Sequence, residues 1–504
     1  MKIPSLVLVL LCCPYLLTGC DHPSKGVQLA NAPAPTAVPE IAWFEGSVEQ
    51  ALAAATREKK LLLIYWGAKW CPYCQALRNT VFTRPDFIAK TTLFVSVYLD
   101  GDLPGAQAWG ETFKVSGYPT LLVLKPDRSE LARMSGGMDL SLYAALLDDA
   151  LQDNRPIQDV LTHAGALEDC HRLSYYGWES AALQDMDATK LATALTAAAA
   201  RCQGTEQVRL QIDALNFALQ AHADRSDLIE RVRTLYDLLD HPQAVRPAID
   251  LIAGLDDSLF GIVVQQGAAF TQTFRSRWVE RMQETADDTH FGDADRLIVL
   301  ASALDATKEL TPDHTIPGPM QQAARQRIQQ ALALNRDRFK RNDLVNAAGI
   351  IDDELGDIDA ARAMYLKELP NTRTPYYYMS HLAAIAEKQG NPQEALDWMA
   401  KAYAAAEGPD TRLRWGGSYL RGLIRLQPDD TAKIRSVGLQ VAADASPANA
   451  QQPPTLHGRS RASLAKINQA LEHWATTPQR RAVASELASR FLPMNPETSD
   501  PVAG

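Results

Sequence analysis

The sequence of 504 residues lacks a surplus of positive charge. Its 50 Lys and Arg stand against 60 Asp and Glu, so the formal net charge is −10 at pH 7. A protein that binds mainly nucleic acid needs excess Lys and Arg to contact phosphates, so nucleic acid is not expected as the main partner. Hydrophobic residues make up 46% and charged residues 22%, which is ordinary for globular proteins and allows packed cores in roughly three folding units.

Cysteine is also scarce, with 7 in the whole chain. Cys71 and Cys74 form a Cys-x-x-Cys motif, and no second pair lies at the spacing of a zinc ribbon. A tetrahedral zinc ion would need two further ligands, so a half zinc site is the weaker interpretation of this motif. We expect no metal and no bound cofactor.

The N-terminal apolar run is too short to cross a bilayer as a lasting anchor. Met1 and Lys2 give a basic start, and the apolar residues that follow fit a secretory signal peptide. The run ends in Leu-Thr-Gly-Cys at 17–20, which resembles the lipobox of bacterial lipoproteins. This resemblance implies cleavage after residue 19 and a lipid on Cys20. The alternative is a soluble periplasmic protein that is cleaved nearby.

Lipidation would attach the protein to a membrane. Two or more acyl chains on one residue hold a protein stably, whereas a single chain does not. Asp21 follows the cysteine, and in enterobacterial lipoproteins Asp at this position marks retention at the inner membrane, which we therefore favour. Residues 20–40 are rich in Pro and Ala and are predicted to be a semi-extended tether.

The first folded unit is predicted at 41–153. Apolar runs of strand length at 61–66, 92–99 and 120–124 alternate with helical patterns at 48–60, 72–81 and 139–151. Such alternation indicates an α/β unit with a mostly parallel sheet.

Strand signals almost vanish beyond residue 154. We predict a helical domain at 154–335, helical repeats at 336–495 and a polar tail at 496–504. Gly356 and Gly390 lie 34 residues apart, and each is followed five residues later by an alanine, Ala361 or Ala395. These segments resemble tetratricopeptide repeats. The earlier helices could be degenerate repeats or a different helical array.

The redox motif is Trp-Cys-Pro-Tyr-Cys at 70–74, directly after a predicted strand and at the start of a predicted helix. A thiolate at a helix N-terminus is stabilised by the backbone N–H groups there, which lowers the thiol pKa. Cys71 is therefore the predicted attacking sulfur. Cys74, one turn later, is the predicted resolving sulfur that releases the product from a mixed disulfide.

A second motif, Gly-Tyr-Pro-Thr at 117–120, precedes a predicted strand. Together the two motifs resemble the thioredoxin superfamily. The resemblance implies a thioredoxin-like fold, a cis bond before Pro119, and substrate docking by Trp70, Tyr118 and Pro119. The Ser-Gly-Gly at 135–137 matches the glycine that follows the family's hairpin.

The sequence departs from ordinary thioredoxin beside the cysteines. The family's buried Asp is Tyr65 here, and the accompanying Lys is Ser96. Three candidates then remain as proton acceptor for the resolving thiol: the Tyr65 hydroxyl, water and Asp100. Residues 78–87 resemble the secreted group that includes the reductase domain of the membrane electron-transfer system, which favours reduction or isomerisation over oxidation.

Four thiols remain after the predicted cleavage, and an even number in an oxidising compartment permits disulfides. Besides the redox pair these are Cys170 and Cys202, which could join two antiparallel helices. A structural disulfide is the favoured interpretation. An electron-relay pair that serves Cys71 and Cys74 is the alternative.

Two functions follow from these patterns. The first is a membrane-tethered periplasmic thiol–disulfide oxidoreductase, whose partners are protein dithiols or disulfides and a membrane or periplasmic electron partner. Its helical repeats would select substrates. The second is a redox-inactive scaffold, in which helical repeats bind partners and the thioredoxin-like unit holds a client.

Overall fold

The computed structural model describes residues 40–69, 71–101, 103, 106, 109–110, 112–115, 117–135, 142–163, 167–177, 186–255, 258–335, 338–445 and 458–491. All of them belong to one compact unit, Glu40–Gly504. The predicted signal peptide, Cys20 with nearly all of the tether, and the tail at 496–504 lie outside the described residues.

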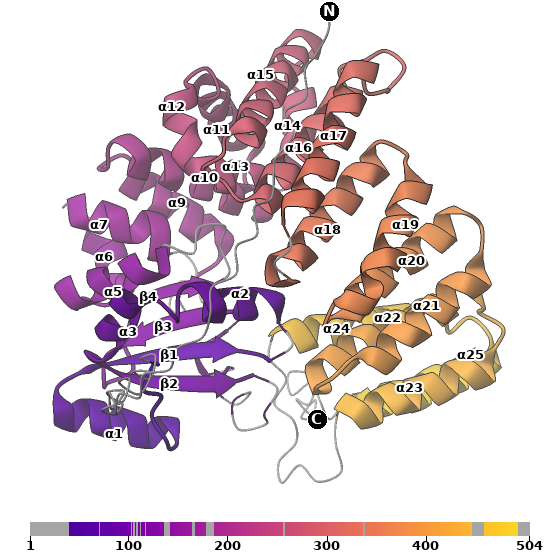
Figure 1. Cartoon of the computed structure of the whole chain (residues 1–504), viewed down its shortest axis with the longest axis horizontal. Coiled ribbons are helices and arrows are strands. Elements are labelled where there is room, and N and C mark those ends of the chain that lie inside the picture. The colour runs from indigo at the N-terminus through magenta and orange to yellow at the C-terminus, as the bar shows by residue number, and fades with distance from the viewer. Residues whose placement is uncertain are drawn as a thin grey trace, which may run out of the picture. The chain divides into compact units, whose positions relative to one another are not determined.

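A four-stranded sheet organises residues 41–152, which we call the sheet domain. Its strands and helices are α1 (Val48–Glu58), β1 (Leu61–Gly67), α2 (Pro72–Thr80), α3 (Pro85–Thr91), β2 (Phe94–Asp100), β3 (Thr120–Leu124), β4 (Glu130–Ser135) and α5 (Leu142–Gln152). The strand order is β2-β1-β3-β4 (Figure 1). The predicted α/β class is confirmed.

The expectation of a mostly parallel sheet is wrong. Strand β1 pairs parallel with β2, whereas both the β1–β3 and the β3–β4 pairs are antiparallel. The hairpin between β3 and β4 makes that pair antiparallel, and β3 itself also runs antiparallel to β1. The sequence pattern did not predict β4. Its residues Glu130 and Arg133 break the apolar alternation, yet both are buried and joined by an ion pair of 2.9 Å.

Alternating side chains of β1 divide the sheet domain into two cores. Leu62, Ile64 and Trp66 face α1, whereas Leu63 and Tyr65 face the side that α2, α3 and α5 cover. Figure 1 shows α1 and α2 on opposite sides of the sheet. The loop between β1 and α2, which ends at Cys71, therefore lies at the C-terminal end of β1, and Cys74 follows in the first turn of α2.

The chain after Gln152 forms the helical region, in which every regular element of the described residues is helical. Its elements are α6 (Ile157–His163), α7 (Leu167–Arg172), η1 (Leu173–Gly177), α9 (Ala188–Ala199), α10 (Gly204–Gln220), α11 (Arg225–Leu238), α12 (Pro242–Val245), η2 (Arg246–Ala248), α13 (Ile249–Ala253), α14 (Ser258–Val264), α15 (Ala268–Asp287), α16 (Asp293–Lys308), α17 (Gly318–Leu334), α18 (Arg338–Glu354), α19 (Ile358–Glu368), η3 (Leu369–Asn371), α20 (Pro375–Lys388), α21 (Pro392–Ala405), α22 (Pro409–Leu426), α23 (Thr431–Ala445), α24 (Gly458–Trp474) and α25 (Pro478–Phe491).

The 34-residue repeat has the same local geometry in both copies. Gly356 follows α18 and Gly390 follows α20, with φ of 73° and 75°, a conformation that glycine adopts at little cost. In both turns the residue after the glycine donates its amide to a carbonyl five residues earlier, at 2.8 Å. Ala361 in α19 and Ala395 in α21 are both buried.

The helical region does not divide at residue 335. One hydrophobic cluster contains residues from Ala192 to Ile351, so the predicted boundary between 154–335 and 336–495 crosses a continuous core. Helix α18 lies after that boundary and packs against α16 before it. The break at Asn335 ends a helix but not a core.

The sheet domain and the helical region also pack against each other directly. Arg172 of α7 donates to the Leu131 carbonyl of β4 at 2.7 Å and pairs with Asp153 at 2.7 Å. Tyr175 packs against the sheet-domain core that contains the cysteines. Removing the helical region would therefore expose part of that core.

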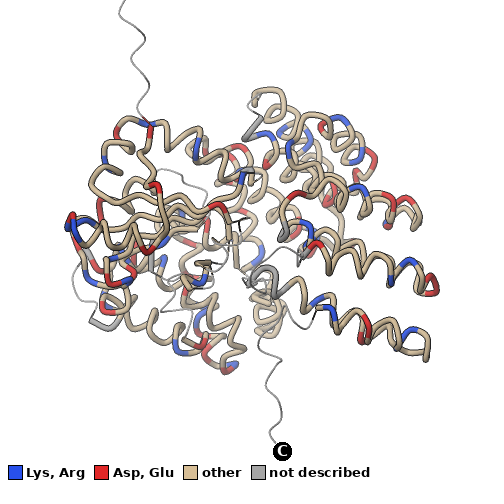
Figure 2. Tube along the Cα trace, turned by 90° about the horizontal axis from the view of Figure 1, so that it is seen from below, with Lys and Arg blue, Asp and Glu red and all other residues tan. Residues whose placement is uncertain are grey.

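Charges of both signs are interspersed along the described helices (Figure 2). Several ion pairs join different helices, including Arg325–Asp357 at 2.5 Å and Arg362–Glu394 at 2.6 Å. Within the described ranges, we find no helix with both the length and the apolar character that a bilayer crossing requires.

Candidate active site

Cys71 caps the N-terminus of α2. Its backbone is extended, with φ −68° and ψ 119°, and its sulfur accepts the Cys74 N–H at 3.1 Å. Pro72 occupies the first turn of the helix, where a proline needs no N–H partner. A thiolate at this position would gain both the hydrogen bond and the favourable field of the helix N-terminus.

Cys74 lies one turn further into α2. Cys71 has 3% of its surface exposed and Cys74 has none, and both are in the thiol form. Cys71 thus keeps slightly more exposed surface than Cys74. This asymmetry is compatible with attack by Cys71 and resolution by Cys74.

Tyr65 of β1 contacts the Cys74 thiol from beneath α2. Burial and the neighbouring thiols raise the pKa of Tyr65 far above its ordinary value. The hydroxyl therefore stays protonated at neutral pH, and it is buried without a hydrogen-bond partner. Of the candidate acceptors named from the sequence, the Tyr65 hydroxyl lies beside Cys74 but keeps its own proton, and its proximity acts to lower the pKa of that thiol.

The surroundings of Cys74 favour its ionised form. Burial acts to raise the pKa of Cys74. The Cys71 sulfur, the Ala68 backbone and the Tyr65 hydroxyl act in the opposite direction together with the Arg78 charge, and the net effect is a lowered pKa of Cys74.

Arg78 and Tyr98 belong to the site, although sequence reasoning did not assign them a role there. The Arg78 guanidinium lies 4.8 Å from the centre of the Tyr98 ring, and that ring stacks on Tyr65 at 5.3 Å. Two signals point to them. Arg78 follows Cys74 by four residues, which places both on one helix face, and Tyr98 is the register partner of Tyr65 in β2.

The other positions named from the sequence lie at the edges of this cluster. Asp100 ends β2, and its carboxylate lies 3.9 Å from the Lys69 amine. Ser96 is buried, and its hydroxyl donates to the Thr91 carbonyl at 3.3 Å. Trp70 and the glycines at 136–137 lie outside the described residues.

Tyr118 and Pro119 precede β3 and are joined by a cis peptide bond. Tyr118 packs against the hydrophobic cluster that contains Cys71 and Cys74, and its ring stacks on Trp66 at 6.1 Å. Pro119 itself is buried. The structure thus brings the Tyr-Pro pair to the same core as the two cysteines.

We compared the sequence with models of known protein families. Residues 48–151 match the family model of a thioredoxin-like domain. This part of the sheet domain is therefore a thioredoxin-like domain, followed by a helical region.

A curated relative matches the same part of the chain. It is the thiol:disulfide interchange protein DsbD 2 of Pseudomonas aeruginosa, 29% identical over 139 residues. The match covers 25% of this chain, and the chain spans about a quarter (24%) of the relative's length.

Solved structures also match over this segment. A thioredoxin from Thermus thermophilus is 23% identical with a TM-score of 0.21, and covers 23% of this chain and 95% of its own. The DsbH oxidoreductase is 20% identical with a TM-score of 0.21, and covers 25% of this chain and 95% of its own.

The second cysteine pair lies in the helical region, outside the thioredoxin-like domain. Cys170 of α7 and Cys202, between α9 and α10, are joined by a disulfide. Both are buried in a hydrophobic cluster that does not contain Cys71 or Cys74. Its position fits a structural crosslink between helices.

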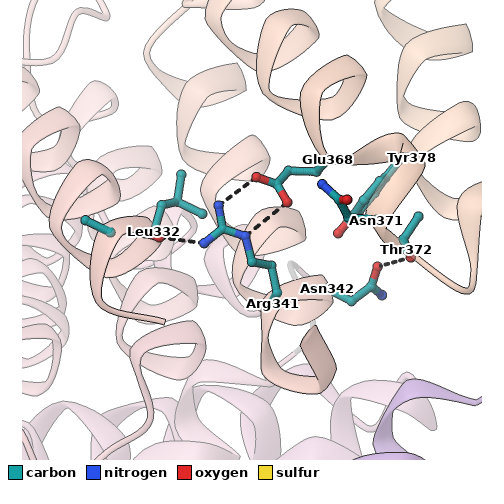
Figure 3. A pocket seen from close by; sticks show the side chains of 8 residues that line it. Leu332, Arg341, Asn342, Glu368, Asn371, Thr372 and Tyr378 are labelled. Atoms are coloured by element: carbon teal, nitrogen blue, oxygen red, sulfur yellow. Dashed lines mark hydrogen bonds and ion pairs between the residues drawn. The ribbon is translucent and has the colours of Figure 1, made fainter. Parts of the chain in front are cut away.

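A cavity of about 450 Å³ opens in the helical region (Figure 3). It is lined by Leu332, Ala333, Arg341, Asn342, Glu368, Asn371, Thr372 and Tyr378. Arg341 and Glu368 pair with each other at 2.6 Å, and Thr372 donates to Asn342 at 3.2 Å. These four polar side chains of the cavity lining therefore already have hydrogen-bond or ion-pair partners within the lining.

No metal centre accompanies the thioredoxin-like domain in the part of the chain that the structure describes. No group of three or more His, Cys, Asp or Glu side chains is arranged there to hold an ion.

Proposed function

We propose that this protein is a thiol–disulfide oxidoreductase of extracytoplasmic proteins that works through Cys71 and Cys74. The observation that carries the proposal is the Cys71 sulfur at the start of α2, which accepts the Cys74 amide at 3.1 Å. A sulfur held this way is prepared to exist as a thiolate, the reactive form in disulfide exchange. The similarity to a thiol:disulfide interchange protein supports the same chemistry.

In the reducing direction, the Cys71 thiolate attacks one sulfur of a client disulfide. A mixed disulfide forms between Cys71 and the client, and the client's other sulfur leaves as a thiolate. The Cys74 thiolate then attacks the Cys71 sulfur, so the Cys71–Cys74 disulfide forms and the second client sulfur leaves. Two electrons pass to the client, whose two thiolates take up the protons that the cysteines gave up.

Client binding is assigned to the surface around Tyr118 and Pro119. A proline has no N–H, so the carbonyl and N–H of the residue before it are the backbone groups available at this edge. An extended client segment pairing there would lie beside the cluster that contains both thiols. Trp70, next to Cys71 in the sequence, is assigned to the same surface.

Turnover requires a partner that resets the dithiol. In the reducing direction, this partner is a membrane or periplasmic protein dithiol that gives two electrons to the Cys71–Cys74 disulfide. We favour reduction or isomerisation over oxidation. The supporting resemblance is that of residues 78–87 to secreted reductase domains.

The proposed location is the periplasmic face of a bacterial membrane, with a lipid on Cys20 as the anchor. Detergent-free fractionation and intact mass of the mature protein test this part separately. The native chain should be in the membrane fraction, and its Cys20 should carry the mass of a diacylglyceryl group. C20A should either appear in the soluble fraction or keep its uncleaved signal peptide. A native chain without added lipid would contradict the anchor but not the chemistry.

The catalytic assignment is tested with the mature chain in an insulin-reduction assay with dithiothreitol. C71S should reduce the rate to the uncatalysed level, because the attacking sulfur is gone. C74A should retain the attack and accumulate a mixed disulfide with the client, which non-reducing gels and mass spectrometry detect.

The matched control is C170A/C202A, which lacks the other cysteine pair. This variant should still reduce insulin at temperatures at which the variant itself is folded. If C71S and C74A were as active as the native chain, the dithiol would have no catalytic role, and the scaffold function would be favoured. The full chain is needed because Arg172 and Tyr175 complete the packing of the sheet domain.

A further inference from the structure

The cavity of the helical region is lined in part by a helix that contacts the redox helix. Its lining residues come from α17, α18, the end of α19, the turn η3 with Thr372 after it, and α20. Helix α18 supplies Arg341 and Asn342 to the lining, and the same helix packs against α2, which Cys71 caps. A molecule bound in the cavity would therefore be held by a helix that touches the redox helix.

The charged side chains of the cavity lining neutralise each other. Both carboxylate oxygens of Glu368 accept hydrogen bonds from the Arg341 guanidinium, from Nε at 3.0 Å and from Nη2 at 2.6 Å (Figure 3). The remaining nitrogen, Nη1, donates to the backbone carbonyls of Leu332 and Asn335. A charged ligand would have to compete with this bidentate pair, so the lining favours an uncharged ligand.

Two buried side chains of the lining have a polar group without a partner. Asn342 is 6% exposed, and its side-chain oxygen accepts the Thr372 hydroxyl at 3.2 Å, whereas its amide nitrogen has no hydrogen-bond partner among the described residues. Tyr378 is 1% exposed, and within the described ranges its hydroxyl has no hydrogen-bond partner either. Buried donors without an acceptor cost free energy, so a ligand that carries acceptors would be stabilised here.

The remaining wall and the size of the cavity limit what that ligand can be. Leu332 and Ala333 of α17 supply an apolar side, and the volume of about 450 Å³ lies within the range of ligand pockets. The ligand therefore combines carbonyl-type acceptors with small or apolar parts and carries no charge. An extended peptide has these properties, because each residue presents a backbone carbonyl.

We propose that this cavity binds an uncharged, extended segment of the client protein, whose backbone carbonyls accept hydrogen bonds from Asn342 and Tyr378. The inference rests on the proposed dithiol function, because the substrate of that chemistry is a protein. Since α18 also contacts α2, a client bound here is held on the side of the helical region that meets the redox helix. The site thus selects clients with neutral segments.

The first test is binding of a probe that cannot exchange disulfides. The probe is a short cysteine-free peptide of Ala, Ser and Gln with blocked termini and an uncharged dye, and fluorescence anisotropy with the mature chain measures its affinity. Y378F keeps the ring and loses the hydroxyl, so it should weaken binding about fivefold, as for one hydrogen bond between uncharged groups. N342D keeps the oxygen that Thr372 contacts but replaces the donor nitrogen by an acceptor, and should weaken binding further.

Filling the cavity is the second test. A333W adds an indole to the lining without removing a hydrogen-bonding group, and should abolish binding of the probe. Its matched control is A323W, on the same helix and outside the lining. The matched control for Y378F is Y376F, because Tyr376 is a buried tyrosine of the same helix that does not line the cavity. Both controls should bind as the native chain does, and circular dichroism should show all variants folded.

Insulin reduction gives a readout that depends on client binding and on chemistry separately. Y378F and A333W should raise KM and leave kcat unchanged, because they remove client binding and leave both thiols in place. C71S should bind the probe with native affinity and fail to reduce insulin. A peptide in which Glu and Lys replace Gln should bind the native chain more weakly than the neutral probe.

Native affinity for the probe in both Y378F and A333W would overturn the proposal, and so would a native chain that does not bind the probe. Binding of N-acetylglycinamide without binding of the peptide would identify a free small amide as the occupant and would also overturn it. These results leave the dithiol function standing if the native chain reduces insulin and C71S does not. A native chain that binds the probe but fails to reduce insulin would remove the proposed function instead.

Discussion

The two cysteine pairs of this chain are all buried, yet their surroundings differ. Cys71 and Cys74 lie three residues apart at the start of one helix, where backbone N–H groups, Tyr65 and Arg78 surround sulfur. Cys170 and Cys202 are 32 residues apart in sequence and join two segments of the helical region within an apolar cluster. Burial alone thus does not decide which pair is reactive. The polar groups around the sulfurs do.

The largest difference expected between the pairs is chemical accessibility to alkylation. In the folded, mildly reduced chain, iodoacetamide should modify Cys71, because its sulfur lies at a helix N-terminus and is not held in a disulfide. Cys170 and Cys202 should stay unmodified. Peptide mass mapping without further reductant measures both.

Alkylation of Cys170 or Cys202 under these conditions would contradict a structural disulfide. It would instead favour the electron-relay interpretation of this pair. A control digestion after full unfolding and reduction should show that all four thiols can be modified.

The next difference concerns stability. Replacing both cysteines in C170A/C202A opens a loop of 32 residues, which should lower the free energy of unfolding by about 3 kcal/mol. The reduced pair Cys71 and Cys74 closes no loop, so C71A/C74A should cost less. Urea titrations of the mature chain measure both variants against the native protein.

Equal losses of stability in the two double variants would mean that the crosslink adds little beyond the packing of its side chains. Retention of insulin reduction in C170A/C202A, measured well below its unfolding transition, would separate a structural role from a redox role.

The same contrast shows how far the sequence predicts the fold. Strand β3 was predicted with the bounds that the structure has, Thr120–Leu124, because four consecutive apolar residues after Thr120 indicate a buried strand. Strand β4 was not predicted, because its buried ion pair between Glu130 and Arg133 looks like surface in the sequence. The hairpin was therefore implied only by the family's glycine at 135–137, and the antiparallel direction of β3 against β1 was not predicted.

The candidate site was predicted where its signals are local. The cysteines and the Tyr-Pro pair lie in short motifs, and Tyr65 stood out as a departure from the family pattern. That the Tyr65 hydroxyl keeps its proton beside Cys74 depends on burial, which the sequence does not give.

The smallest effect expected is that of Tyr65→Phe, which changes one hydroxyl beside the resolving sulfur. The variant keeps the ring, which packs against Tyr98 and Phe82, but loses the buried hydroxyl that acts to lower the pKa of Cys74. The Cys74 thiolate should therefore become slightly less populated, and resolution of the mixed disulfide should slow by about threefold, as for a thiol pKa shift of half a unit.

Stopped quench-flow with acid and mass analysis of the mixed disulfide measures this step, while the initial attack by Cys71 should change little. Tyr403→Phe is the matched control. It removes a tyrosine hydroxyl that donates to Asp444 in the helical region, and Tyr403 is far from both thiols in the sequence. If Tyr65→Phe resolved the mixed disulfide at the native rate, the polar surroundings of Cys74 would not include this hydroxyl. The reactivity of Cys71 and Cys74 would then depend on the helix N-terminus and Arg78 alone. These two features would be what distinguishes the Cys71–Cys74 pair from the Cys170–Cys202 disulfide.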